Sequence, residues 1–348
     1  MSLPTSFEAF RAQAAPGRLV PVWRDCLLDV DTPVSAFAKL RRGPFAFLLE
    51  SAPAGSETWS RYTFLGTEPR GAWRVRDGAV ATWTPEAGWC DEAPVADPFA
   101  DLKARLATHA PVDAPELGAF WAGAVGFFGY DMVRHVERLP HAPRRAIDAP
   151  DALFVLTRTV VVIDHLTSQA RVVCAVPVDA ADEATLRAQY DAALADVDAA
   201  IARLRAPSPL APLVLDDDAP PAEGTSSLTR EAFEAAVARI KAYIVAGDCF
   251  QCLIARRIAV PHDFDGATLY RALRALNPSP YMFHLVLDGV ELVGSSPEVL
   301  VRLQEGTVTV RPIAGTRRRG RTAADDARMA AELLADEKER AEHVMLVD

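Results

Sequence analysis

The spacing of apolar residues predicts a strand-rich N-terminal part that is followed by a long helix. Short apolar or β-branched runs, typical of strands, occur at residues 45–49, 61–66 and 153–163. A further run at 170–176 follows a turn and predicts a hairpin with 153–163. Residues 181–204 are rich in alanine and have apolar positions at helical spacing, so they predict a helix.

A proline-rich and acidic segment follows that helix. Residues 206–226 contain five prolines and three consecutive aspartates. Because proline fixes φ and lacks a backbone donor, regular structure is interrupted there. We therefore predict a boundary inside this segment, between an N-terminal region 1–222 and a second region 223–348.

The second region predicts helices on either side of a strand. Thr229 suits the N-cap of a helix whose apolar residues recur at helical spacing and which Gly247 ends. Residues 249–260 predict a strand, and a second helix is expected at 267–276.

Two hairpins and a terminal helix complete the second region. The hairpin turns are predicted at Asp288-Gly289 and Glu305-Gly306. The second hairpin leads into Arg311–Gly320, RPIAGTRRRG, and residues 323–348 predict one long helix. That helix reaches the last residue without a glycine or proline to end it, so we expect the chain to be part of a longer protein.

Composition and charge limit the classes of function. The 348 residues are half apolar, which allows a large core and about two domains. A net charge of -10 argues against bulk nucleic-acid binding. The sequence has no apolar run long enough for a membrane helix and no signal peptide at its start, so we expect a cytoplasmic protein that binds neither nucleic acid nor membrane.

The five cysteines predict structural thiols. Their number is odd and most are far apart, which does not suit a disulfide framework. Cys249 and Cys252 form a C-x-x-C pair, but no second pair of ligands accompanies it, so a zinc site is not expected.

Glu339 and Glu342 are candidates for a metal site. They are three residues apart in the terminal helix and therefore share a face. Two carboxylates on one face suit a hard cation such as Mg²⁺. The alternative is a solvated surface whose carboxylates pair with Lys338 and Arg340.

Two other polar features each have a structural alternative. Glu298 lies between two strands, where a carboxylate is either a turn residue or a general acid or base. The arginines of 317–321 form either a solvated loop or a phosphate-binding cluster. The glycines of GAVGFFGYD, residues 123–131, are not spaced for a dinucleotide, and we expect them to allow close backbone packing.

The order of several motifs resembles component I of anthranilate synthase, in the family of chorismate-utilising enzymes. The motifs are LLES at 48–51, RYTFLG at 61–66, GFFGYD at 126–131, FQCLIARR at 250–257, NPSPYMFHL at 277–285, GSSPEVLVR at 294–302, TVRPIAGTRRRG at 309–320 and LLADEKERAEHVMLVD at 333–348. They span nearly the whole chain. The family's chain continues beyond residue 348, so the resemblance implies that about the last third, with a catalytic histidine and a second metal-binding glutamate, is absent.

The resemblance implies a fold, a reaction and a partner. The fold is α+β, a large and mostly antiparallel β-sandwich flanked by helices. Ammonia attacks C2 of chorismate as the C4 hydroxyl leaves, and elimination of pyruvate then gives anthranilate. The family uses Mg²⁺ to bind a substrate carboxylate and takes ammonia from a glutamine amidotransferase subunit, component II, in a hetero-oligomer.

The family's functional positions fall on residues of this sequence. Glu342 matches the metal ligand, with Glu339 beside it, and Glu298 matches the acid that faces the leaving hydroxyl. Gly315 and Thr316 match contacts to chorismate.

Two further positions concern the choice of reaction. Gln251 aligns with the lysine base of relatives that add water, and Ala314 with the lysine nucleophile of aminodeoxychorismate synthase. The absence of an amine at both positions favours direct amination by ammonia, with aminodeoxychorismate synthase as the alternative.

The resemblance also implies feedback inhibition by tryptophan. The matching residues are Ser51, Pro280, Tyr281 and Met282, where the alternative for Tyr281 and Met282 is the start of a core strand. An indole needs an apolar slot, and its ammonium and carboxylate need a few polar groups. A second hypothesis follows, that this chain alone binds tryptophan and has no turnover.

Overall fold

The computed structural model describes residues 5–52, 61–118, 120–216 and 218–348. Two compact units are present. The first comprises residues 1–211 together with 270–348, and the second comprises residues 212–269. No helix in the described ranges is long and apolar enough to cross a membrane.

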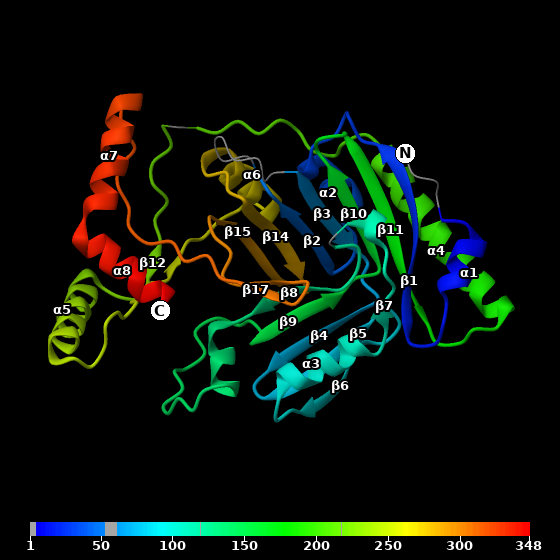
Figure 1. Cartoon of the computed structure of the whole chain (residues 1–348), viewed down its shortest axis with the longest axis horizontal. Helices are drawn as coiled ribbons and strands as arrows, with labels where there is room; N and C mark the ends of the chain where they lie inside the picture. Colours follow the sequence, from blue (N-terminus) through cyan, green and yellow to red (C-terminus); the bar gives the residue numbers. More distant parts are fainter. Residues whose placement is uncertain (1–4, 53–60, 119, 217) are drawn as a thin grey trace. The chain divides into compact units, whose positions relative to one another are not determined.

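An eight-stranded sheet forms the centre of the first unit within the described residues (Figure 1). Its order is β15 (Val290–Ser296), β14 (Tyr281–Leu287), β2 (Phe45–Glu50), β3 (Tyr62–Thr67), β10 (Thr159–Asp164), β11 (Gln169–Val178), β1 (Arg18–Leu27) and β7 (Ala110–Pro111). All neighbours are antiparallel except β1 and β7. The predicted strands at 45–49, 61–66 and 170–176 and the hairpin turning at Asp288-Gly289 are confirmed.

A second sheet of five strands packs on one face of the first. Its order is β6 (Gly88–Pro94), β5 (Ala79–Thr84), β4 (Gly71–Arg76), β9 (Ala152–Leu156) and β8 (Ala124–Phe128). Phe45, Phe47 and Leu285 of the larger sheet share a buried cluster with Ala72 and Val155 of the smaller one. The predicted α+β fold with a mostly antiparallel sandwich is therefore confirmed.

Helices cover the sheets from outside the sandwich. The larger sheet carries α1 (Phe7–Gln13), α2 (Pro33–Leu40) and α4 (Glu183–Leu204). Buried residues of α4 such as Leu186 and Val197 join Leu48 and Val172 of the sheet in one core cluster. The smaller sheet carries α3 (Pro98–Ala107), whose Leu102 clusters with Trp73. Two 3₁₀ helices, Pro115–Leu117 and Tyr130–His135, lie in the loops.

The β-branched run at 153–163 is two strands, so its prediction as one strand was wrong. β9 and β10 lie in different sheets, and Thr157 lies between them. The Thr157 hydroxyl accepts a hydrogen bond from the Gly123 amide at 3.0 Å and is buried. Thr157 therefore bonds to the segment before β8 and lies between two strands of similar composition.

The second unit has little regular structure apart from one helix. α5 (Arg230–Ala246) begins at the predicted N-cap, Thr229, whose hydroxyl accepts from the Ala232 amide. The strand predicted at 249–260 was wrong for most of its length. Only β13 (Ile258–Ala259) is paired there, with β12 (Thr225–Ser226), and a strand needs hydrogen bonds from a neighbour to form. α6 (Gly266–Leu276) then leads back to the first unit.

The C-terminal part contains a short hairpin and two helices. β16 (Arg302–Gln304) and β17 (Thr307–Thr309) confirm the predicted turn at Glu305-Gly306. The helix predicted over 323–348 was wrong as a single element, because it divides into α7 (Ala323–Ala335) and α8 (Glu337–Val347). Asp336 is extended at the break, with ψ at 117°, and its carboxylate caps the second helix.

Candidate functional site

The turn at Gly315 lies against the two C-terminal helices. Gly315 has a φ of 84°, which favours glycine, and its backbone faces Leu333 of α7 and Glu339 of α8. A Cβ placed on Gly315 would lie 3.2 Å from Glu339 Oε2 and 2.9 Å from Leu333 Cδ1. Two segments that sequence analysis assigned to substrate and metal therefore meet, and Thr316 is the next residue along the turn.

Arg317 connects the same turn to the helix break. Its Nη2 donates to Asp336 Oδ2 at 2.6 Å, and its Nη1 to Glu339 Oε1 at 3.3 Å. The amide of Glu339 donates to the Asp336 carboxylate, which is the main reason that the pKa of Asp336 lies below its ordinary value. The solvated loop expected for 317–321 therefore does not describe Arg317, which is half-buried and paired on both sides.

The two carboxylates proposed for a metal share one cation in this structure. Lys338 Nζ lies 3.0 Å from Glu342 Oε2 and 3.6 Å from Glu339 Oε1. The hydrogen bond to Glu342 raises the pKa of Lys338 above its ordinary value. This is the pairing with Lys338 that the surface alternative predicted, and the same carboxylate oxygens would also suit Mg²⁺. No group of three acidic, histidine or cysteine ligands occurs in the described residues.

The candidates for acid–base chemistry lie in both units. Glu298 is half-buried, two residues after β15, and Ser296 Oγ donates to its carbonyl at 3.0 Å. Gln251 belongs to the second unit, where its side chain is exposed. Ala314 precedes the Gly315 turn.

The candidate tryptophan residues come together across β2 and β14. Met282 pairs with Glu50, and the Ala52 amide donates to the Ser279 carbonyl at 3.0 Å, so Ser51 lies beside the start of β14. Side chains alternate along a strand. Met282 is accordingly 1% exposed within the core, whereas Tyr281 is 42% exposed. Met282 therefore lies in the core strand, as the alternative to a tryptophan contact predicted.

A cavity of about 320 Å³ opens over β3, β10 and β11. Its lining includes Arg61, Tyr62, Phe64, Asp164 and Arg171. Arg61 donates to both oxygens of Asp164, at 3.1 and 2.8 Å, and this pairing holds the pKa of Asp164 below its ordinary value. Phe64 pairs with Leu49 of β2, two residues before Ser51. The cavity therefore has both apolar and charged walls, but its lining includes none of the four tryptophan candidates.

Comparison with known proteins identifies the family. The model for "chorismate binding enzyme" matches residues 47–348. The chain belongs to the chorismate binding enzyme family. This membership agrees with the resemblance drawn from the motifs.

The chain is similar to several anthranilate synthase component 1 proteins. The chain is 37% identical to that of Aquifex aeolicus, covering 100% of this chain and 69% of the relative. It is 40% identical to that of Pseudomonas putida, with 98% and 69% covered, and 42% identical to that of Mycobacterium tuberculosis strain H37Rv, with 100% and 68% covered. The chain therefore spans about two thirds of the length of its relatives.

Solved structures of the family have the same fold. Component I of anthranilate synthase from Streptococcus pneumoniae TIGR4 superposes with a TM-score of 0.66 at 27% identity, covering 93% of this chain and 66% of that one. The menaquinone-specific isochorismate synthase of Escherichia coli gives 0.57 at 14% identity, with 96% and 63% covered, and shows the fold alone.

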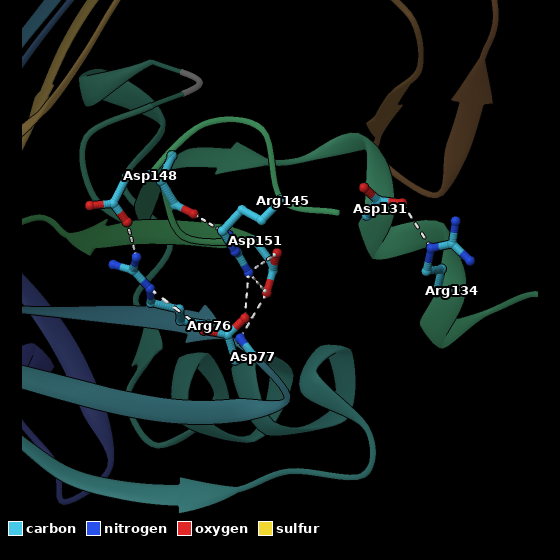
Figure 2. A network of polar contacts seen from close by, with 8 residues as sticks. Arg76, Asp77, Asp131, Arg134, Arg145, Asp148 and Asp151 are labelled. Carbon is cyan, nitrogen blue, oxygen red and sulfur yellow. Dashed lines mark hydrogen bonds and ion pairs between the residues drawn. The ribbon is translucent and has the colours of Figure 1, made fainter. Parts of the chain in front are cut away.

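The glycines of the GFFGYD segment allow close backbone packing, as predicted. A Cβ on Gly126 would collide with the Leu153 carbonyl of the neighbouring strand. The amide of Gly129 donates to the Asp151 carbonyl at 2.7 Å. Nearby, Figure 2 shows Arg145 between Asp77 and Asp151. These exposed ion pairs fix surface loops and add little stability.

Sequence reasoning missed the charged groups around the candidate sites. Arg317 lies in a run of arginines and Arg61 in a strand motif, so neither was predicted to form a specific ion pair. Arg274 and Tyr270 of α6 both bind the Glu50 carboxylate, 220 or more residues earlier in the chain. Their only sequence signal is the helical spacing of four, which places both on one face of α6.

Proposed function

We propose that the chain acts as component I of an anthranilate synthase. It would catalyse the Mg²⁺-dependent amination of chorismate at C2 by ammonia, followed by elimination of pyruvate to give anthranilate. The proposal is supported by the relatives that cover the whole chain. The observation that carries it is the contact of Glu339 with the backbone of Gly315, since it joins the two segments assigned to metal and substrate.

The residues would have separate roles in this reaction. Gly315 and Thr316 would hold chorismate at the turn, where no side chain at 315 blocks the approach to its backbone. Glu298 would donate a proton to the C4 hydroxyl, which leaves as water while ammonia bonds to C2. Gln251 stands at the sequence position where other family members have a base, and its neutral amide would favour ammonia over water as the nucleophile.

Glu339 and Glu342 would hold Mg²⁺ in place of the Lys338 ammonium. When bound, Mg²⁺ would neutralise one of the two carboxylates of chorismate, which suits a protein with a net charge of -10. Arg317 would hold Glu339 in position through its 3.3 Å contact.

Tryptophan is the proposed inhibitor, and a cytoplasmic glutamine amidotransferase subunit the proposed source of ammonia. The pairing of β2 with β14 supports the inhibitor, because it brings Ser51 beside Pro280 and Tyr281. The cavity over β3, the strand next to β2, has mixed apolar and charged walls that would suit an indole amino acid. The same observation favours the second candidate, a chain that binds tryptophan without turnover.

The test is a chorismate assay with ammonium and Mg²⁺ that follows anthranilate fluorescence and identifies products by mass spectrometry. Anthranilate that disappears in a Glu298→Gln variant would support the proposal. Aminodeoxychorismate as the product would favour the alternative enzyme instead. Tryptophan heat in a calorimeter, without any product from chorismate, would favour the binding chain.

A further inference from the structure

Glu50 is a buried carboxylate at the end of β2. It is 3% exposed. Arg274 donates Nε and Nη2 to it at 2.7–3.0 Å, and the Tyr270 hydroxyl donates to it at 2.7 Å. These three side chains, named here the Glu50 clamp, join β2 to helix α6 across more than 200 residues of chain.

Stability alone does not explain such a group. Burying a carboxylate and a guanidinium removes both from water, and the attraction between them often only offsets that loss. Apolar residues would fill the same place with similar stability. The directed hydrogen bonds, in contrast, fix the register and orientation of the elements that they join.

The elements joined by the clamp are those that carry the tryptophan candidates. Glu50 directly precedes Ser51 and pairs with Met282. Arg274 lies near the end of α6, which leads through Asn277 to Pro280. The clamp therefore sets the distance between the end of β2 and the turn that starts β14.

The same turn is tied to the strand that leads to Glu298. Ser295 Oγ donates to the Asn277 carbonyl at 2.6 Å, and Asn277 Nδ2 lies 3.4 Å from Ser295 Oγ. Tyr281 pairs with Ser296, whose hydroxyl donates to the Glu298 carbonyl. Movement of the turn would thus displace the segment of Glu298.

We propose that Arg274 is a positioning residue, which acts through Glu50 to hold Ser51 and the Pro280–Met282 segment at the separation that tryptophan requires. The inference rests on the proposed function. It adds a residue that does not touch the inhibitor but governs its affinity.

Arg274→Met is the test, with Arg271→Met as the matched control. Arg271 lies on the same helix, and its Nη2 donates to the Ala211 carbonyl at 2.7 Å, away from Glu50. Calorimetry with tryptophan should show about tenfold weaker binding or more in Arg274→Met, the effect of losing one strong positioning contact. Arg271→Met should bind as the wild type does.

A double-mutant cycle separates positioning from general damage. Arg274→Met leaves a buried charge without its main partner, so adding Glu50→Gln should recover stability but not tryptophan affinity. Arg274→Lys should restore part of the affinity. Tyr270→Phe, which removes one hydrogen bond and keeps the ring, should weaken binding roughly three- to fivefold and keeps the test open if Arg274→Met does not fold.

The outcomes separate this inference from the proposed function. Wild-type protein that binds no tryptophan would overturn this inference and the proposed inhibition, whereas the chorismate assay tests the amination separately. Wild-type binding with unchanged affinity in folded Arg274→Met and Tyr270→Phe would overturn the clamp alone. Full recovery of affinity in the Glu50→Gln, Arg274→Met double variant would also overturn it, because the directed contact would then be dispensable.

Discussion

The carboxylate of Glu339 lies against the backbone of Gly315, where only a hydrogen atom separates it from the turn. The segment between these two residues includes α7, and the extended Asp336 brings them together. The contact couples the shape of the turn to the position of a candidate metal ligand.

Gly315→Ala should have a larger effect than the backbone strain at its positive φ, because the added Cβ would also displace Glu339. Gly247 has the same φ of 84°, but a Cβ added there would meet no atom within 4 Å, so Gly247→Ala reports the backbone strain by itself. We expect about 1 kcal/mol or more from φ at each position. The additional displacement of Glu339 should appear only in Gly315→Ala, as loss of chorismate binding by calorimetry. Equal, intact binding in both variants would contradict the contact's role.

Removing either candidate metal ligand should weaken Mg²⁺ binding, while removing Lys338 should strengthen it. Glu339→Gln and Glu342→Gln each lose a charged oxygen donor, and we expect about tenfold weaker binding or more. Lys338→Met removes the cation that both carboxylates share, so Mg²⁺ no longer competes with it. Mg²⁺ titration in the presence of chorismate measures these changes, with Glu337→Gln as the control on the same helix. A Lys338→Met variant with weaker binding would argue against the site.

The N-cap of α8 should make the C-terminal helix sensitive to acid. The pKa of Asp336 in the folded state lies below its ordinary value, because the Glu339 amide donates to its carboxylate. The charged carboxylate therefore stabilises the fold fully above the ordinary aspartate pKa of about 4. This stabilisation is lost as the pH falls through the lower pKa of the folded state. Asp336→Asn keeps a cap without the charge, so its helical circular dichroism should change less between about pH 5 and pH 2 than that of the wild type. Identical acid profiles would contradict the assignment.

The cysteines should differ sharply in reactivity. Cys174 is 1% exposed, and burial raises the pKa of its thiol to about 12. At pH 8 only about 10⁻⁴ of it is thiolate, so it should resist alkylation in the folded protein. Cys252 is exposed and should react first. Mass spectrometry of tryptic peptides after brief iodoacetamide treatment distinguishes them, with urea-unfolded protein as the reference in which both react. Early labelling of Cys174 would contradict its burial.

Local sequence patterns predicted the strands of the sandwich better than they predicted which strands pair with one another. The apolar runs of β2 and β3 and the Asp288-Gly289 turn depend on neighbouring residues, so local composition and turn chemistry were sufficient. Nothing in the run at 153–163 marked Thr157 as the point where the chain changes sheets, because threonine suits a strand equally well. The strand predicted at 249–260 failed for a related reason, since its formation depends on a partner that composition does not reveal.

The candidate sites depended on contacts that are remote in sequence. Spacing alone placed Glu339 and Glu342 on one helical face. Gly315 approaches Glu339 because the helix breaks at Asp336. The helical spacing of residues 323–348 continues through Asp336, so the sequence did not predict this break. Glu50 and Arg274 are more than 200 residues apart, and no local sequence pattern at either residue predicts their contact.

The position of β14 has a consequence for cutting the chain. β14 lies between β2 and β15 in the eight-stranded sheet, although residues 206–226 separate it from β2 in sequence. An N-terminal piece made without it would leave the backbone groups of Phe45–Glu50 without a neighbour on one side, an edge that invites pairing with other chains. A protease that cleaved only the proline-rich segment would yield two pieces held together by that ladder. The N-terminal region is therefore expected to aggregate when expressed alone and to survive a single nick when the rest of the chain is present.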